Sequence, residues 1–264
     1  MIRSNTKYQY THVLLVDENF CTLPNIHVGG IEQKNGTLYV ADSRKEQQAI
    51  LEFDIANGLY ELPSNMVDSM FGYRYVLQQS SSFHSPTKPS FIAYDNDLNK
   101  FVIGTYARCG KKVGTHVDSE KCFTQPKNRL VWFDKNKDNN NYTADSFDSS
   151  TDSCDWNYFS EMQGAVSASI NNSTIIWVSS SYGPIANSHL HVVNASTSFT
   201  GDCPKMDINK DEVQIFQFPP GLEDLHIEKT ASNDDQNIWM ITEFGTRRVF
   251  TSQVNNFLPR CDEL

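Results

Sequence analysis

The chain has 264 residues, 39% of them hydrophobic and 12% aromatic, which is enough for a large packed core. Its net charge of −10 would repel a phosphate backbone, so no nucleic-acid partner is expected. No apolar run comes near the roughly 20 residues that cross a bilayer, so no membrane span is expected either.

The first residues are polar and lead into a short apolar stretch. Residues 1–12 lack the apolar core of a signal peptide, so we expect that a signal peptide was removed or that the chain is a piece of a longer protein. Residues 10–17 have the composition of a strand, and they precede all the repeats that follow.

One strand–turn–strand phrase recurs four times along the chain. Its copies begin near His27, Ser90, Gln163 and Glu223, and each holds two short apolar strands around a polar turn. Each copy is followed by a third strand in which apolar and polar residues alternate, at 49–55, 129–135, 188–193 and 247–254. Repeats of this length predict the blades of a β-propeller.

A fourth, outer strand follows three of the repeats, at 73–79, near 155–162 and at 213–219. The last repeat has none, so we expect residues 10–17 to complete it and to close the ring. The sequence therefore predicts one all-β domain over residues 1–264, a β-propeller of four blades, or of five if the chain is truncated. Helix is expected only as a short turn at 62–71, and residues 134–156 read as a polar surface insertion.

Six cysteines form an even set without a CxxC pair, which favours disulfides over a zinc site. Cys109 and Cys122 would close one loop, and Cys21 with Cys261 would lock the ring, which leaves Cys154 with Cys203; the four cysteines outside the local pair allow three connectivities. Five glycosylation acceptors begin at Asn35, Asn141, Asn171, Asn172 and Asn194. Together these features predict a secreted, disulfide-bonded glycoprotein.

Seven short phrases follow one another in a fixed order: HVGGI, LYVAD, LEFDI, YRYVLQQ, MQGAVS, GLEDL and IWMITEFGTRRVF. In these phrases and their order, residues 10–254 resemble a group of secreted bacterial propeller-like proteins of uncharacterised function. The chain has Leu222 where that group usually has Pro, and it lacks a further N-terminal repeat found there. The resemblance implies the fold and carries no established activity.

The first strand of a propeller blade lines the central channel, whose mouth is the usual ligand site. The candidate site residues are therefore the polar residues at the start of the repeats, together with two acids that lie one strand away and could reach the channel mouth. The first set is His27, Ser90, Gln163, Glu223 and Asp224, and the two acids are Asp42 and Glu243. His27, Glu223 and Asp224 are the candidate catalytic acid–base groups, and the other four are candidate ligand-binding residues. The alternative is that these side chains satisfy one another and buried water.

Two further patterns concern metals, and one concerns aromatic side chains. Oxygen-bearing side chains recur as in a calcium loop, at Asp134, Asn136, Asp138, Asn140 and Asp145, although a solvated turn is the alternative. His189 and His191 share a strand face but lack a third ligand. We expect Trp132, Trp177 and Trp239, which occupy similar places in three repeats, in the core between blades.

The sequence contains no nucleophile elbow, no zinc-protease motif and no phosphate-binding loop. We therefore expect a monomeric binding protein that takes a small molecule, a glycan or a protein at the channel mouth. An enzyme with hydrolase-like acid–base chemistry and a structural extracellular component are the alternatives, since propellers serve all three purposes. Calcium is the one cofactor that the sequence suggests.

Overall fold

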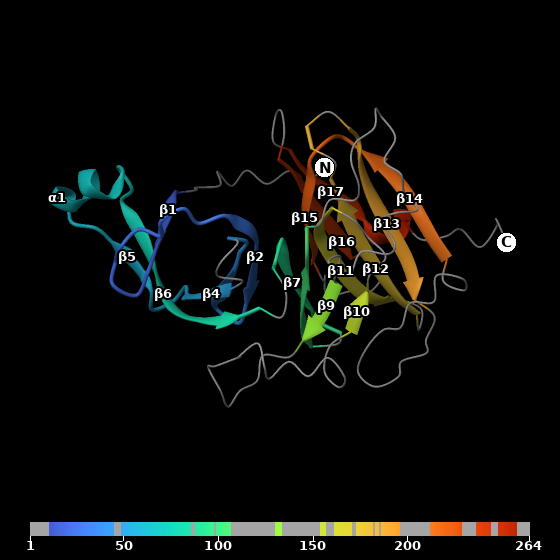
Figure 1. Cartoon of the computed structure of the whole chain (residues 1–264), viewed down its shortest axis with the longest axis horizontal. Helices are drawn as coiled ribbons and strands as arrows, with labels where there is room; N and C mark the ends of the chain where they lie inside the picture. Colours follow the sequence, from blue (N-terminus) through green and yellow to red (C-terminus); the bar gives the residue numbers. More distant parts are fainter. Residues whose placement is uncertain are drawn as a thin grey trace, which may run out of the picture.

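The computed structural model describes residues 11–44, 49–85, 88–97, 99–106, 130–133, 154–156, 161–170, 173–181, 183–184, 186–195, 212–228, 236–243 and 248–257. The chain is all-β, and its strands form four sheets (Figure 1). Helix is confined, in this part of the chain, to α1 (Ser64–Val67) and the short turns η1 (Asp68–Met70) and η4 (Val254–Phe257). None of these helices is long and apolar enough to cross a membrane.

The first sheet has an antiparallel body and two additions at its outer edge. Its body is formed by β2 (Val28–Lys34), β3 (Thr37–Asp42), β4 (Ala49–Asp54) and β6 (Tyr75–His84). The additions are β1 (Val13–Val16), which pairs parallel with β6, and β5 (Leu59–Glu61), which pairs antiparallel with it.

The other three sheets are antiparallel and follow chain order. The second contains β7 (Phe91–Asp95), β8 (Lys100–Gly104), β9 (Leu130–Phe133) and β10 (Cys154–Trp156). The third contains β11 (Met162–Ile170), β12 (Ser173–Ser180), β13 (Ser188–Ala195) and β14 (Glu212–Phe218). The fourth contains β15 (Leu222–Glu228), β16 (Asn237–Thr242) and β17 (Val249–Gln253).

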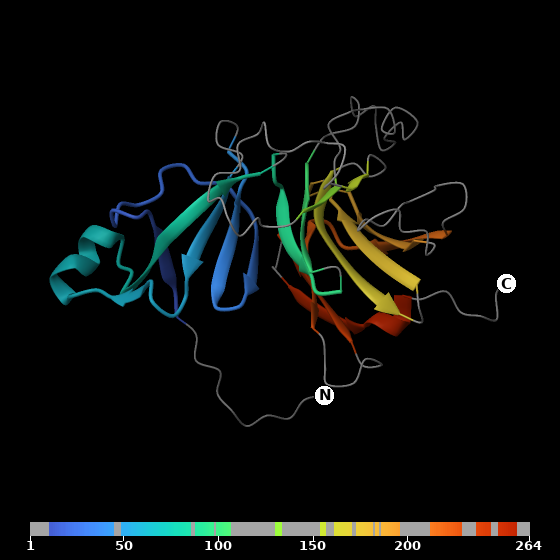
Figure 2. The same ribbon diagram turned by 90° about the horizontal axis from the view of Figure 1, so that it is seen from below.

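The repeated phrases are confirmed as strand pairs, and the alternating segments are confirmed as the third strands β4, β9, β13 and β17. The prediction that residues 10–17 complete the last repeat is wrong. Figures 1 and 2 place β1 on β6, at the end of the molecule away from β15–β17. Val13 and Leu15 pack there against the buried Leu51, Phe53 and Leu77, so the first sheet offers this strand an apolar surface to cover.

The innermost strands of the four sheets contact one another in sequence, β2 with β7, β7 with β11 and β11 with β15. Glycine permits the close approach of the last pair. A Cβ at Gly164 would lie 2.8 Å from the carbonyl oxygen of Glu223 and 2.9 Å from the nitrogen of Leu225. Any larger residue at this position would push β15 away from β11.

Apolar side chains fill the spaces between sheets. Phe101 and Phe133 stack at 5.7 Å between the first and second sheets, beside Ile50 and Phe83. One larger cluster, which includes Trp132 and Trp177, joins the second, third and fourth sheets. The fourth sheet contributes Ile238 and Met240 to this cluster, whereas the alternate residues Trp239 and Ile241 point the other way and are exposed.

Candidate functional site: a groove between the first and last sheets

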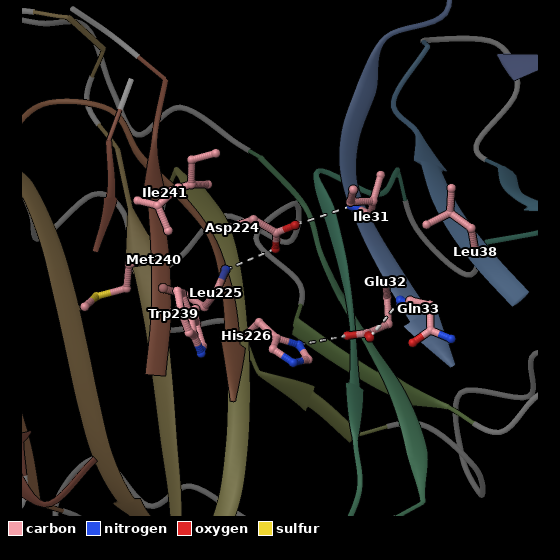
Figure 3. Close-up of a pocket in the computed structure, with 11 residues that line it drawn as sticks. Ile31, Glu32, Gln33, Leu38, Asp224, Leu225, His226, Trp239, Met240 and Ile241 are labelled. Carbon is pink, nitrogen blue, oxygen red and sulfur yellow. Dashed lines mark hydrogen bonds and ion pairs between the residues drawn. The ribbon is translucent and has the colours of Figure 1, made fainter. Parts of the chain in front are cut away.

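A cavity of about 390 Å³ lies between β2 of the first sheet and β15–β16 of the last (Figure 3). Its apolar wall is formed by Ile31, Leu38, Leu225, Trp239, Met240, Ile241 and Val249. Its polar wall is formed by Glu32, Gln33, Asp224 and His226. We call this cavity the groove.

The strand period explains why apolar side chains line the groove. Successive residues of a strand point to opposite faces, so Ile238 and Met240 are buried while Trp239 and Ile241 are exposed toward the groove; the buried Met240 borders the groove as well. Ile31 on β2, across the groove from β16, is 53% exposed, Ile241 is 41% exposed and Trp239 is 37% exposed. These exposed side chains form a surface that a ligand could cover.

Glu32 lines the groove and connects three strands. Its side chain is buried, Oε1 accepts the backbone N–H of Gln33 at 2.8 Å, and Oε2 accepts that of Tyr94 on β7 at 3.1 Å. The Nδ1 atom of His226 on β15 lies 3.9 Å from the same Oε2. The neighbouring Glu32 carboxylate raises the pKa of His226, and burial of the imidazole opposes this effect.

Asp224 on β15 reaches across to the first sheet. Its Oδ2 accepts a hydrogen bond from the backbone N–H of Ile31 at 3.3 Å, and its Oδ1 accepts one from Leu225 at 3.1 Å. Burial raises the pKa of Asp224 to about 7, the charge of Glu32 adds to this, and the two backbone hydrogen bonds and His226 oppose it. Asp224 therefore changes its charge near neutral pH.

Of the three predicted catalytic groups, Asp224 alone lines the groove. His27 is exposed ahead of β2, and its carbonyl oxygen accepts hydrogen bonds from the backbone and hydroxyl of Ser43, both at 2.9 Å. Glu223 is half-buried, and its carbonyl oxygen accepts a hydrogen bond from the hydroxyl of Ser179 at 2.6 Å. The structure therefore does not gather His27, Glu223 and Asp224 into one lining set.

The four predicted ligand-binding residues lie outside the groove. Ser90 is buried with its hydroxyl 2.8 Å from the carbonyl oxygen of Gly104, and Gln163 is half-buried at an irregularity of β11. Asp42 is fully buried and forms an ion pair with Arg44. Glu243 is exposed beyond β16. The partners of Ser90 and Asp42 are thus backbone carbonyl groups and Arg44, and not other candidate site residues.

The predicted metal ligands fall outside what the structure describes. This holds for all five calcium candidates, Asp134, Asn136, Asp138, Asn140 and Asp145, which stay a prediction. Among the described residues, no group of three or more His, Cys, Asp or Glu side chains could hold a metal ion. The rings of His189 and His191 are 6.0 Å apart, and burial lowers the pKa of His191 to about 4.

The cysteine pairing is also untested. Cys21 is exposed and has no disulfide partner among the described residues, while Cys261, its predicted partner, lies outside them. Cys109, Cys122 and Cys203 lie outside them as well. All three disulfides therefore remain predictions for the oxidised protein.

Sequence reasoning missed Glu32 and His226 as partners of Asp224. One signal was available, because Asp224, His226 and Glu228 alternate with the buried Leu225 and Ile227 and so mark one polar face of a strand. The sequence does not show that this face meets β2. Trp239, which was expected in the core, instead lines the groove and donates from Nε1 to Oε2 of Glu228 at 2.9 Å.

Comparison with protein-family models and with curated proteins finds no match. Among solved structures, the chain is similar to the hydrazine synthase of Kuenenia stuttgartiensis, with a TM-score of 0.35 and 12% sequence identity. The match covers 88% of this chain and 46% of that one, so the chain spans less than half the length of its structural neighbour.

Proposed function

We propose that the chain is a four-bladed, propeller-like binding protein whose ring is open at one junction, and that the groove at this junction binds a small molecule. The succession of contacts from β2 to β7, β11 and β15 supports a ring of four sheets. The last junction, between β15 and β2, is spanned by the hydrogen bond from Ile31 to Asp224 and by the contact of His226 with Glu32.

The composition of the groove carries this proposal. Small-molecule sites are concave, occupy roughly 300–1,000 Å³ and combine an apolar lining with a few convergent polar groups. The groove has a volume of about 390 Å³, and the exposed Ile31, Trp239 and Ile241 face it beside Asp224 and Glu32. Exposed apolar side chains that line one concave surface are typical of a binding site.

A neutral fluorescent probe tests this proposal. N-phenyl-1-naphthylamine should bind with an increase in its emission, and Ile31→Gln should weaken the binding at least about tenfold, because a polar group would replace the apolar wall. Ile215→Gln is the matched control, since Ile215 on β14 is 59% exposed and does not line the groove. Equal binding by the two variants would overturn the proposal.

Acid–base hydrolysis is the second candidate, and the environment of Asp224 favours it. A carboxyl group whose pKa is about 7 can donate a proton at neutral pH, and Glu32 supplies a second carboxyl group in the same groove. Hydrolysis of aryl glycosides that Asp224→Asn abolishes would establish this activity. If the protein leaves a panel of such substrates intact, the hydrolase hypothesis fails and the binding function stands.

We also propose that the protein is secreted. The support is the set of glycosylation acceptors and the even set of cysteines, and Asn35 is exposed in the turn between β2 and β3. A shift in mass after glycosidase treatment of protein from a eukaryotic secretory host would test it.

A further inference from the structure

The polar wall of the groove carries acidic groups and an imidazole. Two carboxyl groups line it, one on each side, since Glu32 belongs to β2 and Asp224 to β15. Within the described residues, neither Lys nor Arg lines the groove. Lys34, which also belongs to β2, donates to Oδ1 of Asn96 at 2.6 Å and stacks 3.9 Å above the ring of Tyr94.

We propose that the ligand of the groove is an amphipathic monocation, with an apolar body against Trp239 and Ile241 and a cationic group beside Asp224 and Glu32. This inference rests on the proposed binding function and adds the chemical class of the ligand. A single positive charge placed between β2 and β15, which each contribute a carboxyl group, would be attracted by both carboxylates where water is partly excluded.

The Asp224 carboxyl group retains capacity for such a partner. Each carboxylate oxygen can accept two hydrogen bonds, whereas Oδ1 and Oδ2 of Asp224 each accept one from the backbone. Figure 3 shows the Asp224 carboxyl group between β15 and β2, with Trp239 on the same side of the groove as His226. The indole face adds attraction for a cation at short range.

The charged groups around Asp224 set the dependence on pH. They are Glu32 from β2 and His226 from β15, and Glu228 in turn acts on His226. A bound cation lowers the pKa of Asp224 and of His226, so binding near neutral pH should release protons. Affinity should accordingly rise with pH as Asp224 ionises and His226 becomes neutral.

Two probes of nearly the same shape isolate the charge. Phenyltrimethylammonium and tert-butylbenzene differ in one unit of charge, and the cation has no proton to lose, so every released proton comes from the protein. At pH 8 we expect phenyltrimethylammonium to bind the unmodified protein at least about tenfold more tightly than tert-butylbenzene does. Calorimetry in two buffers of different ionisation enthalpy should show proton release near pH 7.

Variants then assign the effect to Asp224. Asp224→Asn should remove most of the preference for the cation and most of the proton release, while Glu243→Gln, on an exposed acid outside the groove, should change neither. Because the probes are compared on the unmodified protein, the test does not depend on the folding of Asp224→Asn.

The outcomes separate the two proposals. Equal or weaker binding of the cation than of tert-butylbenzene, with N-phenyl-1-naphthylamine still bound, would overturn the inference and leave the proposed function intact. Tighter binding of phenylacetate than of the cation would overturn it as well. If none of the probes binds, the proposed function itself fails.

Discussion

The third and fourth sheets arise from the same repeated phrase and differ in what covers them. On β12, Ile175 to Val178 are all buried, because neighbouring sheets cover both faces. On β16, the pattern alternates between buried Ile238 and Met240 and exposed Trp239 and Ile241. Similar strand sequences thus produce a structural core in one sheet and a candidate binding surface in the other, according to the neighbours that the fold provides.

The largest expected effect comes from the two tryptophans at equivalent places. Trp177→Ala should lower the free energy of unfolding by about 3–5 kcal/mol, because Trp177 is fully buried. Trp239→Ala should lower it by about 1 kcal/mol or less, because its side chain is 37% exposed. Urea titrations of the two variants measure both values, and similar losses would contradict the contrast between the sheets.

A smaller effect is expected where the third sheet touches the fourth. Gly164→Ala should lower the free energy of unfolding by about 1–3 kcal/mol, because its Cβ would lie within 3 Å of backbone atoms of Glu223 and Leu225. Gly72→Ala is the comparison variant, since a Cβ there meets nothing within 4 Å and the cost comes from φ of +82°, about 1 kcal/mol. Thermal unfolding would rank the pair, and a cost for Gly164→Ala below that of Gly72→Ala would refute the close contact.

The third prediction concerns the pH dependence of stability and Asp224, which lines the groove. The pKa of Asp224 is raised in the folded state, so its protonated form is favoured there. Stability from this group is therefore present at low pH and is lost as pH rises from about 4 through about 7. Asp224→Asn should therefore gain stability over the unmodified protein, and the gain should be clearly larger at pH 8 than at pH 5, because most of the loss falls between these two values. Chemical unfolding at the two pH values measures this, and a gain independent of pH would argue against a raised pKa.

The smallest effect is expected at the exposed edge of the fourth sheet. Val249→Thr should change stability by less than about 0.5 kcal/mol, because Val249 is 65% exposed. Val192→Thr on β13, where the valine is 3% exposed, should cost about 1–3 kcal/mol because it buries a hydroxyl group. Equal costs would mean that the face carrying Val249 is covered in solution.

The strands could be predicted because their signal is local. Alternation located β4, β13 and β17, and composition located α1. The place of β1 could not be predicted, because its apolar residues suit either edge and only the packing of Val13 and Leu15 on the first sheet decides between them.

The site could be predicted only in part for a related reason. Asp224 was found because it is polar at the start of a repeat. Its coupling to Glu32 and His226 depends on residues of β2 and β15 that lie about 190 positions apart and meet only in three dimensions. The exposure of Trp239 likewise depends on what packs against β16 in three dimensions, which a pattern within one strand does not record.

The serial contacts of the four inner strands have a mechanical consequence. β2 contacts β7, β7 contacts β11 and β11 contacts β15, whereas two side-chain contacts link β15 with β2. The width of the groove therefore depends on how the sheets pack against one another elsewhere. A substitution that changes the packed volume between the second and third sheets would therefore shift the fourth sheet. It would alter the spacing of Asp224 and Glu32 without a direct contact to either residue.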